Sequence, residues 1–188
     1  MKDEEEKIVK KAKKGDDKAF GELYDTYMPR IYRFIFLKVK RKQDAEDLSH
    51  QVFLSAWQNI QSYEFRGFPF SSWLYRIAGN AVIDYYRTWK NNASLDNMPE
   101  DYFSENPELA KNVDAVMDIQ FVKTFLHKLE SDQQNVLIMK FVDDLSNKEI
   151  AEALGKKEGA VRVIQHRALK QLKKYIDESR PYSKTEEA

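Results

Sequence analysis

Apolar residues recur at helical spacing in two blocks of this chain, and no apolar period survives in the stretch between them. That stretch, residues 91–112, is rich in Asn, Ser, Pro and acidic side chains, which is the composition of a linker. No segment alternates apolar and polar residues for long enough to predict a strand. The sequence therefore predicts an all-α protein in which two small helical domains, residues 1–90 and 113–178, are joined by a flexible acidic linker and followed by a polar tail at 179–188.

Composition narrows the class of protein. The 188 residues include no Cys, and 42% of the side chains are hydrophobic, which is enough for a packed core. Without Cys there can be no disulfide, thiolate nucleophile or Cys-based zinc site. No apolar run approaches the ~20 residues that cross a bilayer, and the first residues do not resemble a secretory signal. We expect a cytoplasmic protein without membrane insertion.

The charges cancel overall, with 31 Lys and Arg against 31 Asp and Glu, but they are sorted along the chain. Residues 30–42 hold six basic and no acidic side chains, residues 91–118 hold seven acids and one Lys, and residues 156–174 hold seven basic side chains and one acid. Two basic blocks on either side of an acidic one favour separate contact surfaces. Clustering of charge on solvated faces is the alternative.

Local signals place the helices of the first block. Asp16 can cap a helix whose apolar side chains follow a helical period. Pro29 is expected to interrupt that helix, and residues 31–39 are expected to continue as a very apolar second one. Ser71 or Ser72 is expected to cap the last helix of this block.

The second block carries the pattern of a helix-turn-helix. Ser131 opens a sequence of capping-box form, and Ser146 with Glu149 forms a second capping box. Gly155 suits the left-handed position after a short helix, and a longer helix is expected over residues 158–175 with one apolar and one cationic face. Such a helix fits a DNA major groove with flanking phosphates. A plain helical hairpin with a solvated Lys face is the alternative.

Six aromatic side chains lie within residues 63–75, interleaved with arginines. Single-stranded DNA is held by cations along its backbone and by aromatic faces that stack on unpaired bases, and an extruded base needs a pocket with polar groups. A loop over residues 63–70 that leads into a helix with Arg76, Asn80 and Arg87 could provide both. The alternative is that these rings are simply core.

The residues resemble bacterial sigma factors of the extracytoplasmic-function (ECF) type. Residues 19–27, the segment around DAEDL at 44–48 and the segment FSSWLYRIAGN with Asp84 and Arg87 are similar to region two of that family, and residues 145–169 resemble region four. The resemblance implies a transcription initiation factor that binds core RNA polymerase, recognises promoter minus-ten and minus-thirty-five elements and promotes DNA opening. Inhibition by an anti-sigma factor is common in the family, so such a protein is a further candidate partner.

The resemblance also implies three sets of contact residues. Acids at a helix start, followed by apolar side chains, would grip the clamp of core polymerase: Asp44, Asp47, Leu48, Gln51, Leu54 and Trp57. The minus-ten element, read as single strand, would be held by Arg66, Phe68, Phe70, Ser71, Trp73, Arg76, Asn80 and Arg87. The minus-thirty-five duplex would be contacted by Lys156, Lys157, Arg162, His166, Arg167 and Lys170. Asp84 is expected to be a structural partner of a nearby Arg.

Some features depart from the family or extend it. Gly79 stands where a basic or bulkier residue is usual, and a mid-helix Gly costs ~1 kcal/mol relative to Ala. Val163 and Ile164 replace a more usual polar and basic pair, which predicts an unusual minus-thirty-five preference. The acidic linker is hypothesised to follow the basic RNA-exit path of the polymerase by mimicking nucleic acid, and a solvated tether is the alternative.

No catalytic constellation is present in the sequence. His50, His127 and His166 lie far apart with no neighbour at metal-ligand spacing, and there is no Gly-rich phosphate loop. We therefore expect no enzyme, no metal and no cofactor. The competing functions are a stand-alone DNA-binding repressor or activator and a protein-interaction module. Near-zero net charge further predicts weak promoter binding by the isolated chain.

Overall fold

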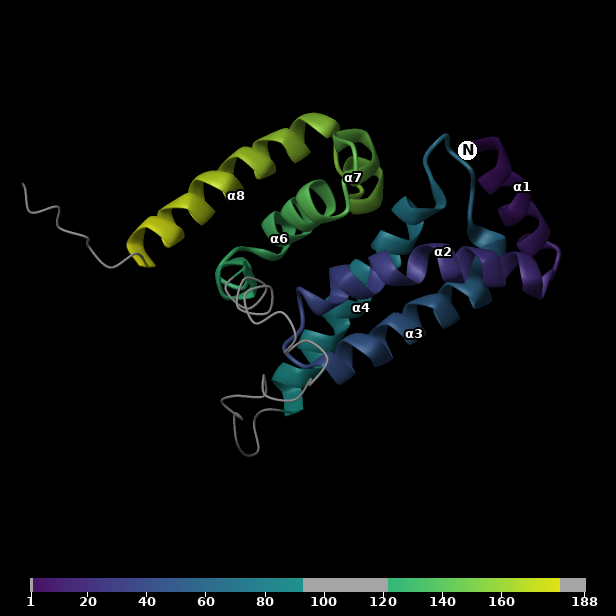
Figure 1. The fold of residues 1–188 in the computed structure, drawn as a ribbon, viewed down its shortest axis with the longest axis horizontal. Coiled ribbons are helices and arrows are strands. Elements are labelled where there is room, and N and C mark those ends of the chain that lie inside the picture. The colour runs from purple at the N-terminus through teal and green to yellow at the C-terminus, as the bar shows by residue number, and fades with distance from the viewer. Residues whose placement is uncertain (1, 93–121, 180–188) are drawn as a thin grey trace, which may run out of the picture.

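The computed structural model describes residues 2–92 and 122–179, and the regular structure in these two ranges is entirely helical, as predicted. In chain order the elements are α1 (Lys2–Lys13), α2 (Asp17–Phe36), α3 (Lys42–Asn59), the 3₁₀ helix η1 (Ile60–Ser62), α4 (Phe70–Asn92), α6 (Ser131–Leu137), the π-helix η3 (Ile138–Val142), α7 (Asn147–Leu154) and α8 (Glu158–Ser179). Figure 1 shows α1 to α4 gathered in one bundle and α6 to α8 beside it. The proposed linker from residue 93 onward, the start of the second domain and the tail from residue 180 lie outside the described residues.

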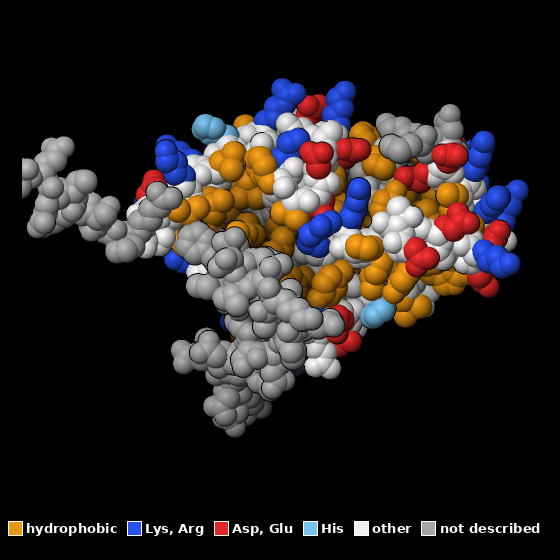
Figure 2. Space-filling view, viewed as in Figure 1, with side chains coloured by type: hydrophobic (Ala, Val, Ile, Leu, Met, Phe, Trp, Pro, Cys, Tyr) orange, Lys and Arg blue, Asp and Glu red, His pale blue; other side chains and the backbone are white. Residues whose placement is uncertain are grey.

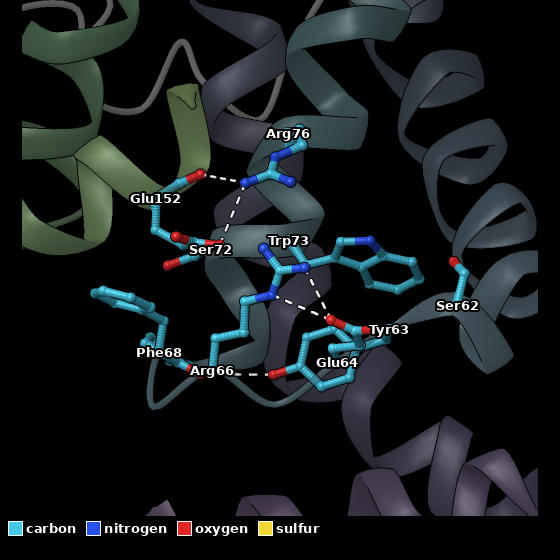
Figure 3. Close-up of a pocket in the computed structure, with 10 residues that line it drawn as sticks. Ser62, Tyr63, Glu64, Arg66, Phe68, Ser72, Trp73, Arg76 and Glu152 are labelled. Carbon is cyan, nitrogen blue, oxygen red and sulfur yellow. Dashed lines mark hydrogen bonds and ion pairs between the residues drawn. The ribbon is translucent and has the colours of Figure 1, made fainter. Parts of the chain in front are cut away.

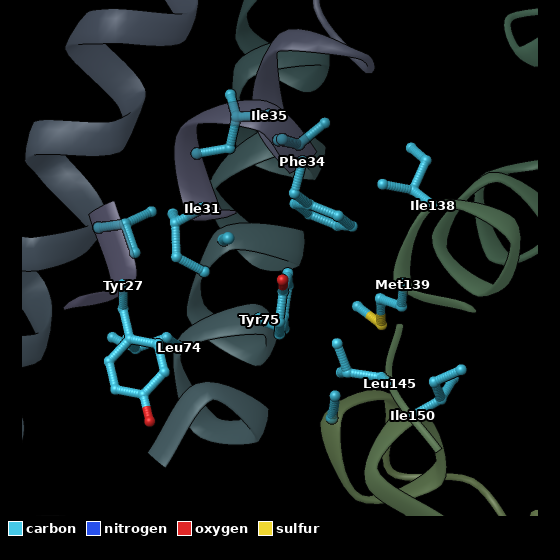
Figure 4. Packing of buried hydrophobic residues seen from close by; sticks show 14 of the residues in the cluster. Tyr27, Ile31, Phe34, Ile35, Leu74, Tyr75, Ile138, Met139, Leu145 and Ile150 are labelled. Atoms are coloured by element: carbon cyan, nitrogen blue, oxygen red, sulfur yellow. The ribbon is translucent and has the colours of Figure 1, made fainter. Parts of the chain in front are cut away.

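Helix α2 organises the first bundle because it packs against α1, α3 and α4. Ile31, Phe34 and Ile35 on α2 are fully buried, and Leu74 of α4 is buried with them (Figure 4). Burying a side chain of this size contributes roughly 1.5–3 kcal/mol. The apolar stretch of residues 31–39 that the sequence singled out is therefore the centre of the core.

Helix α2 runs through Pro29 without a break, so the predicted interruption is wrong. Proline removes one backbone N–H and leaves the carbonyl four residues earlier without its helical partner. Both Pro29 and Asp25, which carries that carbonyl, are exposed, so water can replace the missing bond. The predicted start of the helix is confirmed: the Asp16 carboxylate accepts from the N–H groups of Lys18 and Ala19 at 3.0 and 3.1 Å.

Helix α4 begins at Phe70, so neither Ser71 nor Ser72 is its cap. Both serines are buried in the first turn. The backbone N–H of Phe70 instead donates to a carboxylate oxygen of Glu5, which lies 65 residues earlier in α1. A remote carboxylate thus does at this helix start what a local Ser, Thr or Asp does at others.

Local capping signals work better in the second half. The capping box of Ser146 and Glu149 is present, with the Ser146 N–H donating to the Glu149 carboxylate at 2.7 Å. Gly155 ends α7 with φ of 62°, the left-handed conformation predicted for it. At α6 the expected cap is displaced by one residue: Glu130 is the N-cap, and its N–H donates to the Gln133 side chain at 3.1 Å. Gln133, rather than Gln134, is the residue three positions after the cap.

Helix α8 ends at Ser179, four residues beyond the predicted end at 175. Its apolar face lies as predicted, with Val161 and Ala168 buried and Ile164 and Leu172 half-buried against the core. The same face continues past residue 175 through a half-buried Ile176, which explains the extra turn.

The two halves share one hydrophobic core. Met139 of η3 and Ile150 of α7 belong to the same buried cluster as Phe34 and Tyr75 of the first bundle (Figure 4). Phe34 and Tyr75 pack edge to face with ring centroids 5.3 Å apart. Helix α4 lies directly against α7. The halves predicted as separate domains are thus docked on one another in this structure.

Polar contacts cross the same junction. The Arg33 Nε of α2 donates to the buried Asp143 carboxylate at 3.2 Å, and the Lys38 ammonium donates to the side-chain oxygen of Asn135. Burial lowers the pKa of Lys38 to about 8, because the charged form loses its hydration there. Burial also raises the pKa of the Asp143 carboxyl, while nearby Tyr75 and Arg33 oppose that rise.

Candidate nucleic-acid interface

A loop over residues 63–69 joins η1 to α4 and forms one wall of a small cavity of about 90 Å³. Gly67 bends the loop with φ of 78°, a conformation that residues with a Cβ rarely adopt. The cavity is lined by Ser62, Tyr63, Glu64, Arg66, Phe68, Pro69, Ser72, Trp73, Arg76 and Glu152 (Figure 3). The predicted minus-ten residues Arg66, Phe68, Trp73 and Arg76 are therefore gathered around one opening.

The cations at this opening already have acidic partners. Arg66 is exposed and pairs with Glu64 at 2.8 Å, and this bond lowers the pKa of the Glu64 carboxyl. Arg76 of α4 donates to the carboxylate of Glu152 at 3.3 Å and also to its backbone carbonyl (Figure 3). Because Glu152 belongs to α7, the second half occupies an arginine of the first half's candidate DNA site.

Phe70 and Ser71 do not line the cavity in this structure, so their predicted contact with the minus-ten strand stays a prediction. Phe70 is completely buried and Ser71 is 3% exposed. The Phe70 ring packs on Tyr63 at 5.1 Å and on Trp73 at 5.3 Å between ring centroids. It supports the rings that do border the opening, because an aromatic cluster fixes the orientation of each member.

Asn80 and Arg87 lie farther along α4 and outside the cavity. Asn80 is exposed and lines a groove between α3 and α4. Arg87 pairs with Asp84 at 3.1 Å, so the predicted pairing of Asp84 with a nearby Arg is confirmed. Gly79, next to Asn80, lies inside the continuous helix α4, and a Cβ added there would meet no atom within 4 Å.

The six predicted polymerase-binding residues of α3 divide between two faces. Asp44, Asp47, Leu48 and Gln51 line the groove between α3 and α4, which has a volume of about 770 Å³. Leu54 and Trp57 line a second groove, between α3 and α2. Leu54 is 57% exposed, and the Trp57 ring packs 4.7 Å from Phe20 of α2. Asp44 is partly engaged within the chain, because the Tyr85 hydroxyl donates to it at 2.6 Å.

Four of the predicted minus-thirty-five residues lie exposed on α8, where Figure 2 shows Lys and Arg side chains projecting: Arg162, His166, Arg167 and Lys170. Lys156 and Lys157 lie in the turn that precedes this helix. Arg162, His166 and Lys170 are four residues apart and exposed, so they form one stripe. Arg162 pairs with Glu158 at 2.6 Å, and Lys156 pairs with Asp132 of α6 at 2.8 Å. This stripe belongs to a single helix, α8, which begins directly after the turn at Gly155.

Sequence reasoning missed two acidic residues of the first half's site. Glu152 was absent from the prediction because it belongs to the other half and no local pattern links it to Arg76. Glu5 was missed because no helix was predicted over the first residues. The spacing of Val9 and Ala12, both buried, was the available signal that this segment is a packed helix.

Over residues 2–92 and 122–179, no three His, Asp or Glu side chains group as ligands for a metal ion. No helix in these ranges is long and apolar enough to cross a membrane.

Comparison with known families gives two matches. Residues 23–91 match the family described as Sigma-70 region 2, and residues 122–172 match Sigma-70, region 4. The first match begins within α2 and extends through α3 and the loop over residues 63–69 into α4, and the second extends from before α6 into α8. Helix α1 precedes both matches.

Similar proteins extend over most of the chain. It is 33% identical over 179 residues to the ECF RNA polymerase sigma factor SigW of Bacillus subtilis, covering 90% of this chain and 95% of SigW. It is 32% identical over 180 residues to the ECF RNA polymerase sigma factor BldN of Streptomyces coelicolor, of which the chain spans 64%. The fold is similar to that of CnrH, solved in complex with the cytosolic domain of CnrY, with a TM-score of 0.73 and 22% identity over 94% of this chain and 99% of that one.

Proposed function

Because the chain belongs to the ECF-type sigma factors, the promoter-recognising subunits of RNA polymerase, we propose that its two halves divide promoter recognition between them. The first half captures the melted minus-ten strand, and α8 reads the minus-thirty-five element as duplex. The observation that carries this proposal is the cavity at residues 63–76, where aromatic rings and guanidinium groups meet at one opening.

At the minus-ten element, each of these side chains has a distinct role. Phe68 and Trp73 offer faces on which an unpaired base can stack, and stacking contributes ~1–3 kcal/mol per base. Arg66 and Arg76 hold the adjacent backbone, once their carboxylate partners give way to phosphates. Arg87 extends this cationic track farther along α4. Phe70 and Ser71 act only by supporting the loop from below.

At the minus-thirty-five element, α8 enters the major groove. Arg162 and His166 face base edges, while Lys157, Arg167 and Lys170 contact phosphates. Val163 is 49% exposed on the same helix, where its methyl groups can pack on a thymine methyl. Lys156 reaches DNA only if it leaves Asp132.

Core polymerase binds the groove between α3 and α4. Asp44 and Asp47 present carboxylates to basic residues of the partner, and Leu48 and Gln51 form the floor and wall between them. Leu54 and Trp57 face the other side of α3 and contribute only if the partner wraps around that helix. The clamp of the polymerase is the partner that the family relationship indicates.

The docked arrangement is the resting form of the isolated chain. Phosphate must compete with the Glu152 carboxylate for Arg76 while the two residues are paired, and α4 cannot separate from α7 without exposing their shared core. We therefore expect the isolated chain to bind promoter DNA weakly and to separate its halves when it joins the polymerase. The chain supplies no catalytic group in this scheme, and the polymerase performs the chemistry in the cytoplasm.

An inhibitory protein is a further proposed partner. CnrH, whose fold is similar, was solved with the cytosolic domain of CnrY bound to it. An anti-sigma factor that stabilises the docked halves would keep Arg76 and the α3–α4 groove from their targets.

Transcription by the reconstituted holoenzyme tests the proposed function. Purified core polymerase and the chain are incubated with a library of genomic fragments, and run-off transcripts are compared with those of core polymerase alone. New promoter-specific transcripts are expected. The outcome that contradicts the proposal is a specific duplex footprint by the chain alone without any new transcript, which is the behaviour of a repressor or activator.

A further inference from the structure

Helix α1 lies against the start of α4 and the end of η1, next to the loop that carries the candidate minus-ten site (Figure 1). It precedes the residues that match region 2, which begin at residue 23. Val9 and Ala12 are 4% and 1% exposed, so α1 is anchored on the bundle and does not project into solvent. Its polar side chains on the same side of the helix reach the loop.

Both ends of the loop are bonded to α1. At the end nearest α4, the two carboxylate oxygens of Glu5 accept from two different donors: the Phe70 backbone N–H and the Tyr27 hydroxyl of α2. At the end nearest η1, the Lys13 ammonium donates to the Tyr63 carbonyl at 2.8 Å, and the Gln61 side chain donates to the Lys13 carbonyl. The residues between these anchors, 64–69, include the bend at Gly67.

The chemistry of these contacts is suited to holding α1, α2 and α4 in a fixed arrangement. The first N–H groups of α4 have no partner in their own helix and lie at its positive end, so a carboxylate is the best acceptor for them. One carboxylate can satisfy two donors from different elements, which fixes α2 and α4 relative to α1. Burial raises the pKa of the Tyr27 hydroxyl, and the hydrogen bond to Glu5 raises it further.

We propose that Glu5 and Lys13 are positioning residues that hold the loop over residues 63–70 in the geometry needed to capture the melted minus-ten strand. The inference rests on the proposed function of the loop. Phe70 transmits the position of Glu5 to the site, because its ring packs on both Tyr63 and Trp73. Helix α1 thereby belongs to the strand-capture machinery although it does not touch DNA.

Hydrogen exchange on the full chain tests the first step without any DNA. In Glu5→Ala, exchange of the Phe70 amide and of peptides covering residues 64–70 should rise about tenfold, as expected for the loss of a charge-assisted hydrogen bond. Glu5→Gln should give a smaller increase, because its amide oxygen can accept from only one of the two donors well. Glu4→Ala, an exposed neighbour with the same change of charge, should behave like the wild type.

Strand capture by the holoenzyme tests the second step. The probe is the non-template single strand of a promoter fragment obtained in the run-off experiment above. Holoenzyme with Glu5→Ala or Lys13→Met should bind this strand several-fold to tenfold more weakly, with unchanged affinity for core polymerase. Val9→Ala is the matched control, because it weakens the packing of α1 but leaves both anchors in place, and its strand binding should be unchanged.

The two steps separate the possible outcomes. Equal loss in Glu5→Ala and Val9→Ala would overturn the inference, because α1 would then act only through stability. Unchanged strand binding in Glu5→Ala with faster loop exchange would also overturn it. A wild-type chain that fails to support transcription would contradict the proposed function, and unchanged exchange at Phe70 would contradict the role of Glu5 independently of that failure.

Discussion

The two DNA-facing surfaces of this protein are built in opposite ways. The α8 surface belongs to one helix, on which the exposed side chains of Arg162, His166 and Lys170 follow one another at four-residue spacing. The minus-ten surface combines a loop, the first turns of α4, an acidic partner from α7 and anchors from α1. A single-helix surface should respond to substitutions locally and nearly additively. A composite surface should respond to residues that never touch the ligand.

The largest effect is expected at the composite surface. Trp73→Ala combined with Arg76→Ala removes a stacking ring and a phosphate contact, which together should weaken strand capture about 100-fold, or roughly 3 kcal/mol. Permanganate probing of the holoenzyme on duplex promoter should show the bubble nearly lost. Trp73→Phe with Arg76→Lys should restore part of it. An undiminished bubble in the double Ala variant would contradict the assignment of this surface.

The second effect concerns the single-helix surface. Arg162→Ala with Lys170→Ala should weaken binding of the holoenzyme to a minus-thirty-five duplex about tenfold. The slope of log affinity against log salt concentration should fall by roughly one unit, because only Lys170 of the two contacts phosphate. The losses of binding free energy in the two single variants should add up to the loss in the double variant. Lys174→Ala, near the far end of α8 and paired with Glu178, is the matched control. If the loss of binding free energy in the double variant differed strongly from the sum of the two single losses, the residues of this surface would not act independently.

The third prediction concerns the junction that couples the two surfaces. The pKa of Lys38 is about 8 in the folded chain and 10.5 without burial, so the unfolded chain binds more protons between these values and the free energy of unfolding should rise with pH. From pH 7 to 9.5 the rise should be roughly 1–2 kcal/mol per buried Lys. Lys123 has the same shift, so Lys38→Met should retain only about half of the rise in denaturant titrations. If the free energy of unfolding of Lys38→Met rose with pH as much as that of the wild type, Lys38 would not be a source of this pH dependence.

The smallest effect is expected at the contact between the halves. Glu152→Gln removes the carboxylate charge opposite Arg76 but leaves the backbone carbonyl that Arg76 also contacts. An exposed ion pair contributes ~0–1 kcal/mol, so the isolated chain should bind single-stranded DNA up to about fivefold more tightly by fluorescence anisotropy. Asp177→Asn, an exposed change of the same charge on α8, controls for the altered net charge. An equal gain in both variants would mean that Glu152 does not restrain Arg76.

Local chemistry predicted much of the fold. Asp16, Ser146 and Gly155 mark helix ends as expected, because a cap bonds to groups within three or four residues of itself. The start of α4 was misplaced because its cap, Glu5, comes from another helix. Pro29 was misjudged because the cost of a proline depends on whether water reaches the carbonyl it leaves without a partner.

The sequence predicted which segment forms the candidate site, but not which of its side chains border the opening. The composition of residues 63–76 identified an aromatic and basic region correctly, yet periodicity does not determine which ring of a loop points inward. Phe68 borders the opening and Phe70 lies beneath it. The pairing of Arg76 with Glu152 depends on how the halves dock, and that docking is encoded in the shapes of two apolar faces.

The burial of Lys38 at the junction has an electrostatic consequence for how the protein encounters DNA. Lys38 belongs to the basic segment 30–42, and it is 2% exposed while the halves are docked. Separation of the halves returns this ammonium to water and frees Arg33 from Asp143. The open protein thus presents a more positive segment 30–42 to a polyanion than the docked one does. Its long-range attraction to nucleic acid therefore increases on opening, although its net charge near neutral pH scarcely changes.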